Sequence, residues 1–365
     1  MAMRDETRML LESMNRLFED KSTKQVIDRA ETGVFADDLW RAVAETGVPL
    51  AALPESAGGA DAEWSDLFAV LRVAGRFSAP IPLAETMLAG WVGASAGLEL
   101  SDGPMTVGPV RGGDQLSVAR DGNGWVLSGK ASRVPYASHV AKTILIADGP
   151  DGEMAVALEG TGGAEVTLGK NIANEARDTL AFTRVRLDAD AVGPLGQGVS
   201  RGALYRRGAL ARATMMSGAL ERAMDLAVGY AQERVQFGRP ISKFQAVQQN
   251  LAVLAGQTAA AVAAANLGIQ ALGKVDAERE LFLIGVAKTR VGEAATLACE
   301  IAHQVHGAIG FTKEYALQLS TRRLWSWREE FGSDPEWAAR VGSYACANGA
   351  DGLWEMLTAA QTAIA

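Results

Sequence analysis

The order of helical and strand-rich segments along the chain predicts an α+β fold, with helices at both ends and a β domain between them. Apolar residues recur at helical spacing in the first part of the chain. Short runs of Val, Ile, Leu and Thr follow, and long Ala-rich helical patterns fill the remainder. We therefore divide the chain into an N-terminal helical domain (1–100), a middle β domain (101–192) and a C-terminal helical domain (193–365).

The first 100 residues are expected to be helical. Apolar residues at helical spacing near the start are Met9, Leu10, Met14, Leu17 and Phe18. Similar spacing recurs around Leu39 and Leu67, so several helices are predicted.

From about Ser101 the pattern changes to short runs that are typical of β-strands. The runs are Leu116–Val118, Trp125–Leu127, Thr143–Ala147, Met154–Leu158 and Thr179–Leu187. Gly-Asp, Gly-Asn-Gly and Pro-Asp-Gly sequences between the runs favour hairpin turns. These features predict a small antiparallel barrel or sandwich.

From about Gly193 the pattern returns to long helices, and Ala255–Ala265 is strongly Ala-rich. Small residues at this density are typical of helices that pack closely in a bundle. The apolar tract Leu251–Leu272 is interrupted by polar side chains, so we interpret it as a bundle helix and expect no membrane span.

Composition places the chain among globular proteins. Of its 365 residues, 48% are hydrophobic and 21% are charged. The net charge is −8 and no basic stripe occurs in the sequence, so no nucleic-acid partner is expected. Arg206, Arg207 and Arg212 cluster locally, which usually indicates a solvated helix face; anionic CoA or pyrophosphate is the only ligand that we connect with them.

The cysteines and histidines give no sign of a metal site. Cys299 and Cys346 lie in helical pattern without metal-type spacing, and the three histidines are scattered. The amino terminus has acidic residues and lacks the apolar core of a secretory signal, so we expect a cytoplasmic protein with reduced thiols.

The most informative segment is Arg234–Gln245, which reads RVQFGRPISKFQ within a long helical pattern. An Arg and a Phe at a turn between helices can bind a phosphate and a flat ring, because a guanidinium matches phosphate oxygens and a phenyl face stacks on heterocycles. The alternative is a turn in which Gly238 and Pro240 only interrupt the helix.

Three motifs in order resemble the acyl-CoA dehydrogenase family. RVQFGRPISKFQAVQQNLA begins at Arg234, QVHGAIGFTKEY covers Gln304–Tyr315, and the weaker match LPESAGG covers Leu53–Gly59. The resemblance implies an N-terminal helical domain, a middle antiparallel β-barrel and a C-terminal four-helix bundle. It also implies an FAD-dependent oxidoreductase that desaturates the α,β-bond of an acyl-CoA thioester, in which a glutamate removes the α-proton as hydride leaves for the flavin.

The resemblance also implies the cofactor contacts. Arg234 would bind the flavin pyrophosphate, Phe237 would lie against the dinucleotide, and Gln304 would contact the same cofactor in a neighbouring subunit. Gly307 and Gly310 would allow close backbone approach, although a plain helix-end turn also explains them. A further residue that we place in this shell, with core packing as its alternative, is Gln245.

The part of the pattern that backs the flavin ring is altered. Only Pro109, Gly113 and Asp114 remain of the family's Thr-Glu-Pro-x-Ala-Gly-Ser-Asp loop, and its Trp-Ile-Thr segment is replaced around Arg133–Pro135. Two residues that could still line a ring are Val134 and Tyr136; otherwise the β domain of this chain holds no isoalloxazine.

The usual position of the catalytic base is occupied by Phe331, just before Gly332. Glu330 is adjacent, but one residue turns a helical side chain by roughly 100°, so Glu330 replaces the base only if the backbone shifts. The base position on an earlier helix aligns near Gly208, and no Asp or Glu occurs in Val192–Leu220. A solvated acidic pair formed by Glu329 and Glu330 is the remaining interpretation.

Three hypotheses follow. LWSWREEFGSDPEWAARVG is similar to the base-lacking subunit of heteromeric steroid side-chain acyl-CoA dehydrogenases, so the first is a subunit that completes a partner's flavin site in a tetramer. The second is a self-sufficient homo-oligomeric FAD enzyme that uses Glu330, and the third is a structural paralogue without a flavin role. Neither the acyl group nor the electron acceptor can be inferred from the sequence.

Overall fold

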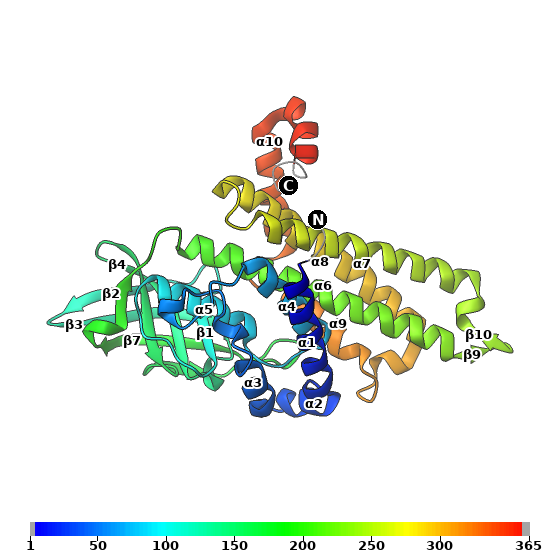
Figure 1. Cartoon of the computed structure of the whole chain (residues 1–365), viewed down its shortest axis with the longest axis horizontal. Helices are drawn as coiled ribbons and strands as arrows, with labels where there is room; N and C mark the ends of the chain where they lie inside the picture. Colours follow the sequence, from blue (N-terminus) through cyan, green and yellow to red (C-terminus); the bar gives the residue numbers. More distant parts are fainter. Residues whose placement is uncertain (1–3, 360–365) are drawn as a thin grey trace. The chain divides into compact units, whose positions relative to one another are not determined.

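The computed structural model describes residues 4–359, which form two compact units (Figure 1). One unit contains the residues up to Leu67 together with Ala79–Gly208. The other contains Phe68–Ser78 together with the residues from Ala209 onward. The division into three domains at 100 and 192 stays a prediction.

The N-terminal part is helical, as the apolar spacing predicts. Its helices are α1 (Asp5–Lys21), α2 (Lys24–Glu31), α3 (Asp37–Ala44), α4 (Trp64–Arg76) and α5 (Leu83–Ser95). The buried face of α1 consists mainly of Leu11, Met14 and Phe18, whereas Met9 is 66% exposed. The helix is therefore confirmed, and its buried side includes Met14 and Phe18 but not Met9.

The middle of the chain forms one eight-stranded sheet in the order β6-β7-β3-β2-β4-β5-β8, with β1 paired to β4 outside this path. Its strands are β1 (Met105–Gly108), β2 (Leu116–Asp121), β3 (Gly124–Pro135), β4 (Lys142–Gly149), β5 (Gly152–Glu159), β6 (Glu165–Thr167), β7 (Arg177–Leu187) and β8 (Val192–Pro194). All five strand runs predicted from the sequence lie within these strands. Two tight hairpins also match the predicted turns, β2–β3 closing at Asp121 opposite Gly124 and β4–β5 at Gly149 opposite Gly152.

The prediction of an antiparallel β-barrel is wrong in two respects. The sheet is mixed, because β1 and β2 both pair with β4 in parallel. The sheet is also open: among the described residues, the end strands β6 and β8 pair only with β7 and β5. Each end strand has three residues, and such short edges limit pairing with another strand.

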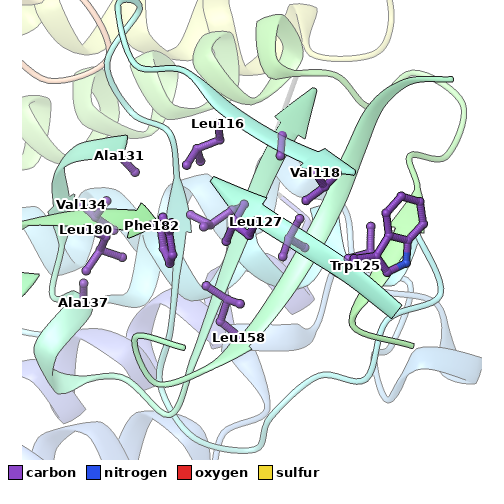
Figure 2. Packing of buried hydrophobic residues seen from close by; sticks show 14 residues of the cluster. Leu116, Val118, Trp125, Leu127, Ala131, Val134, Ala137, Leu158, Leu180 and Phe182 are labelled. Carbon is purple, nitrogen blue, oxygen red and sulfur yellow. The ribbon is translucent and has the colours of Figure 1, made fainter. Parts of the chain in front are cut away.

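One face of the sheet carries an apolar core, which Figure 2 shows at close range. Leu127, Leu145 and Val156 are fully buried there. Trp125 and Phe182 add aromatic bulk from neighbouring strands. This core fixes the strand register, since a one-residue slip would expose every inward side chain.

The second unit is a helical bundle, as the Ala-rich pattern predicts. It contains α6 (Arg201–Glu233) from Ala209 onward, α7 (Gln245–Ala271), α8 (Ala277–His306), α9 (Leu317–Trp327) and α10 (Asp334–Ala359). Helices α7 and α8 lie along one another, and α8 also contacts α9 and α10 (Figure 1). A Cβ on Gly268 would lie 2.8 Å from Leu210 Cδ1 and 3.3 Å from Ala287 Cβ, so α7 packs closely on both α6 and α8.

By length and composition α7 is apolar enough to cross a membrane. A bundle helix passes the same test, and the packing of α7 on α8 agrees with that interpretation. Only 33% of its most apolar 18-residue stretch is buried within the chain. Much of this helix therefore presents uncharged surface outward.

Two glycines allow α4 and α6 to cross at backbone contact. A Cβ on Gly218 would overlap the carbonyl oxygen of Arg72, and a Cβ on Gly75 would overlap that of Met215. Backbone atoms at such a crossing cannot move aside as a flexible side chain can. Glycine is therefore required at both positions.

We expect Gly218→Ala to destabilise the chain by about 1–3 kcal/mol or more, because the added methyl group forces the two helices apart. Gly229→Ala on the same helix is the matched control, since a Cβ there meets nothing within 4 Å. The control should stabilise the helix by about 0.5–1 kcal/mol. Urea unfolding of both variants checks this, and equal stabilities would contradict the close crossing.

Candidate functional site

A short hairpin presents the first sequence motif. Helix α6 ends at Glu233, strands β9 (Val235–Gln236) and β10 (Arg239–Pro240) pair antiparallel, and the Ile241 amide donates to the Arg234 carbonyl at 2.8 Å. The two turn residues, Phe237 and Gly238, have φ of 51° and 81°. Positive φ at both central residues is the type I′ turn geometry, which explains Gly238 and fixes the direction of the Phe237 side chain.

Phe237 and Gln304 line the same groove although they lie far apart in the sequence. The groove has a volume of about 360 Å³ and is almost entirely apolar. Its lining consists of Gln236, Phe237, Ile241, Phe244, Ala246, Val247, Asn250, Gln304 and Val305. The phenyl ring of Phe237 is 92% exposed and meets Phe244 edge to face, with ring centroids 6.1 Å apart. The groove therefore offers aromatic surface to a flat ligand.

The remaining residues of the predicted cofactor shell differ in their surroundings. Arg234 is exposed and precedes the groove residue Gln236 by two positions, and Gln245 is exposed at the first residue of α7; neither belongs to the groove lining. Gly307 has φ of 63° and open space where a Cβ would lie, so a ligand can approach its backbone. Gly310 is buried, and a Cβ there would lie 2.9 Å from His306 Cβ, so packing alone requires this glycine.

Two histidines that the sequence analysis left without a role hold the loop Gly307–Phe311. His306 stacks on Tyr230 with ring centroids 4.6 Å apart, and His303 stacks on Phe311 at 4.1 Å. Burial lowers the pKa of both His303 and His306, which favours their neutral forms. The His-x-x-His spacing on one helix face was the signal that could have linked them.

The strand region expected to back a flavin ring has an irregular backbone. A bulge separates Ala131 from Val134, and Arg133 within it has φ of 56°. Tyr136 is buried, with the Arg177 guanidinium 5.5 Å from its ring centroid. Arg177 also pairs with buried Glu175 at 2.9 Å. Val134 and Tyr136, the two residues expected to line a ring, are both buried, so neither presents open surface within this chain.

Glu330 lies in an ion pair. Arg212 donates from Nε to the Glu330 carboxylate at 2.6 Å, and the two side chains are 2% and 13% exposed. Phe331, at the usual base position, is buried with φ of 52°, and the Arg212 guanidinium lies 5.8 Å from its ring centroid. A carboxylate held by a buried guanidinium is stabilised in its charged form and is a poor proton acceptor.

A buried lysine fixes the turn that carries Glu330. Lys288 Nζ donates to the carbonyl oxygens of Trp327 at 3.0 Å and Arg328 at 2.8 Å, which caps the end of α9. Burial lowers its pKa to about 8. On the other side Arg328 pairs with Asp334. These contacts make the turn rigid, so a register shift toward the usual base geometry is opposed.

The arginine cluster does not form the solvated face that the sequence suggested. Arg207 lies over two tryptophans, 4.2 Å from the Trp91 ring centroid and 4.7 Å from that of Trp64. Arg212 belongs to the Glu330 pair. The third motif also has a packing role, because a Cβ on Gly59 would overlap the carbonyl of Leu53.

Comparison with known proteins gives consistent matches. The model of the acyl-CoA dehydrogenase N-terminal domain matches residues 4–99, and that of the acyl-CoA dehydrogenase C-terminal domain matches residues 196–334. The acyl-CoA dehydrogenase IpdE2 of Mycolicibacterium smegmatis is 26% identical over 324 residues, which are 88% of this chain and 93% of the relative.

Solved structures share the fold. A chain of the ChsE4-ChsE5 complex from Mycobacterium tuberculosis superposes with a TM-score of 0.85 at 22% identity, covering 95% of this chain and 98% of that one. A variant of the Tcur3481-Tcur3483 steroid ACAD superposes with a TM-score of 0.82 at 25% identity, covering 95% and 99%.

The ion pair at Glu330 gives a stability prediction. Arg212→Met should destabilise the chain by about 3–5 kcal/mol near neutral pH, because it leaves a buried carboxylate without its guanidinium. The loss should shrink toward about pH 5 as the carboxylate takes up a proton, since protonation removes the buried charge.

The double variant Arg212→Met/Glu330→Leu is the matched control. It removes both charges and should recover most of the lost stability. Urea unfolding at both pH values measures these effects, and a pH-independent loss in Arg212→Met would contradict the buried-charge explanation.

Proposed function

Because the chain belongs to the acyl-CoA dehydrogenase family, we propose that it is a subunit of an FAD-dependent acyl-CoA dehydrogenase and completes the flavin site of a related partner subunit. The main support is the groove that Phe237 and Gln304 both line, two residues along the chain from the exposed Arg234. Its dimensions and chemistry suit the adenosine diphosphate half of the cofactor.

The residues of the groove and hairpin fit the adenosine diphosphate half of FAD. The apolar lining and the Phe237 ring accept a flat base, and the Arg234 guanidinium is suited to the diphosphate. Gly307 leaves its backbone open to the ligand. Bound FAD supplies the hydride acceptor for oxidation of the Cα–Cβ bond.

The residues that would hold the isoalloxazine ring do not fit in the same way. Val134 and Tyr136, which could line a ring, are buried, and the strand beside them bulges at Arg133. Glu330 is bound to Arg212 instead of being free to accept a proton. We therefore assign the flavin wall and the base to the partner, and a binding role to this chain.

The surface of α7 supports an assembly with a related subunit. No charged residue occurs in this 27-residue helix. Its exposed positions include Ala252, Gly256 and Ala259, and Val253 is 47% exposed. A long helix without charges is usually covered on most sides, and small side chains allow a partner helix to approach closely.

The proposed substrate is an acyl-CoA thioester. The similar Tcur3481-Tcur3483 protein is described as a steroid ACAD, so a steroid side-chain thioester is the acyl group that we propose to test first. The small side chains at Ala209, Ala213 and Ala219 are buried against neighbouring helices, so they do not by themselves indicate a large pocket.

Arg234→Met should lower the affinity of the complex for FAD by about tenfold or more, because it removes a charge-assisted contact to the diphosphate. The measurement is FAD titration of the complex obtained by co-expression with the dehydrogenase-like partner. Lys243→Met is the control, since Lys243 is exposed on the same connection but outside the groove lining.

Glu330→Gln in the same complex should leave kcat within about twofold of the original value, as expected of a side chain that touches no reacting atom. Turnover abolished by this substitution would favour a self-sufficient enzyme instead.

FAD affinity unchanged by Arg234→Met would contradict the shared flavin site.

Val253→Glu should weaken assembly, because it places a charge on the neutral face of α7. Sedimentation velocity should show a smaller species than the unaltered complex. Met9→Glu, which adds the same charge at a 66% exposed apolar position of α1, is the control. An unaltered sedimentation coefficient for Val253→Glu would show that this face of α7 is not an interface.

A further inference from the structure

The hairpin places a second arginine on the same face as Arg234. Arg239 is directly opposite Gln236 in the strand register, and opposed residues project to one face. Arg234 precedes Gln236 by two residues and therefore lies on that face as well. Gln236 lines the groove, so this face borders it.

The Arg239 guanidinium is held by an aromatic contact. Its central carbon lies 4.3 Å from the ring centroid of Phe244, which lines the groove and meets Phe237 edge to face. A guanidinium over an aromatic face retains N–H groups that can donate to an anion. The contact therefore fixes the position of a cation at the rim of an apolar groove.

The surroundings of this cation contain little negative charge. No Asp or Glu occurs between Arg234 and Val275, and the groove lining contains no carboxylate. Glu233, which precedes Arg234, is the acidic neighbour along the chain. An anion at the rim would thus meet two guanidinium groups, while the groove beside it accepts a flat apolar base.

We propose that Arg239 is a second diphosphate-binding residue, which acts with Arg234 on the two phosphates of an adenine dinucleotide. This inference rests on the proposed function and extends it, because it assigns a contact to an arginine that the motif comparison left without a role. One guanidinium for each phosphate matches the charge of the diphosphate and orients it along the hairpin.

The test uses the apo complex with three probes: FAD, ADP and adenosine. Arg239→Met should lower the affinity of the complex for FAD and for ADP by about tenfold. Its affinity for adenosine should stay within twofold of the original value, because adenosine lacks the phosphates. The dependence of FAD affinity on salt should also become shallower in this variant. Arg239→Lys should retain part of the affinity, and Lys243→Met should behave as the unaltered complex does.

The outcomes separate the inference from the proposed function. If Arg234→Met lowers the FAD affinity and Arg239→Met does not, Arg239 only packs on Phe244. The inference about Arg239 then fails, while the proposed function stands. Equal weakening of ADP and adenosine by Arg239→Met would also overturn it, because the loss would then come from a displaced Phe244 ring. If neither variant changes FAD affinity, the shared flavin site fails as well.

Discussion

Apolar surface that the chain leaves uncovered is the constraint on which the C-terminal unit depends. The Phe237 ring is 92% exposed at the tip of a hairpin whose backbone fixes its direction. The charge-free helix α7 begins a few residues later. Exposed apolar surface of this extent is unfavourable in water and marks sites of ligand or protein binding. The proposed cofactor and partner subunit would cover it.

The buried charges of the same unit, unlike its exposed apolar surface, have partners within the chain. Arg212 is neutralised by Glu330, Arg328 by Asp334, and Lys288 is satisfied by two carbonyl groups. These internal contacts convert the region around the usual base position into a rigid structural element. A catalytic carboxylate needs the opposite environment, one in which it can accept a proton. Rigidity here and exposure at the hairpin agree with the proposed binding role.

Much of the fold followed from the sequence, because helical and strand periods differ clearly. The five strand runs and the long helices lie where the patterns place them. The closed barrel was wrong, since closure depends on how the end strands β6 and β8 pair, and three residues in each carry too weak a pattern. Likewise, the sequence located the Arg234 motif, but it could not show that Glu330 faces Arg212 across 118 residues. Such contacts are set by helix packing and not by local spacing.

The two groups of arginines differ in how their charge is balanced. Buried Arg212 has a carboxylate within the chain, whereas the exposed face with Arg234 and Arg239 borders a groove that has none. An exposed cation is hydrated at little cost, so charge alone does not demand a ligand there. The free-energy cost of exposure comes from the adjoining Phe237 ring and apolar groove, which water solvates poorly. A ligand that joins a flat base to an anionic group satisfies both parts of the surface at once, and a dinucleotide has that construction.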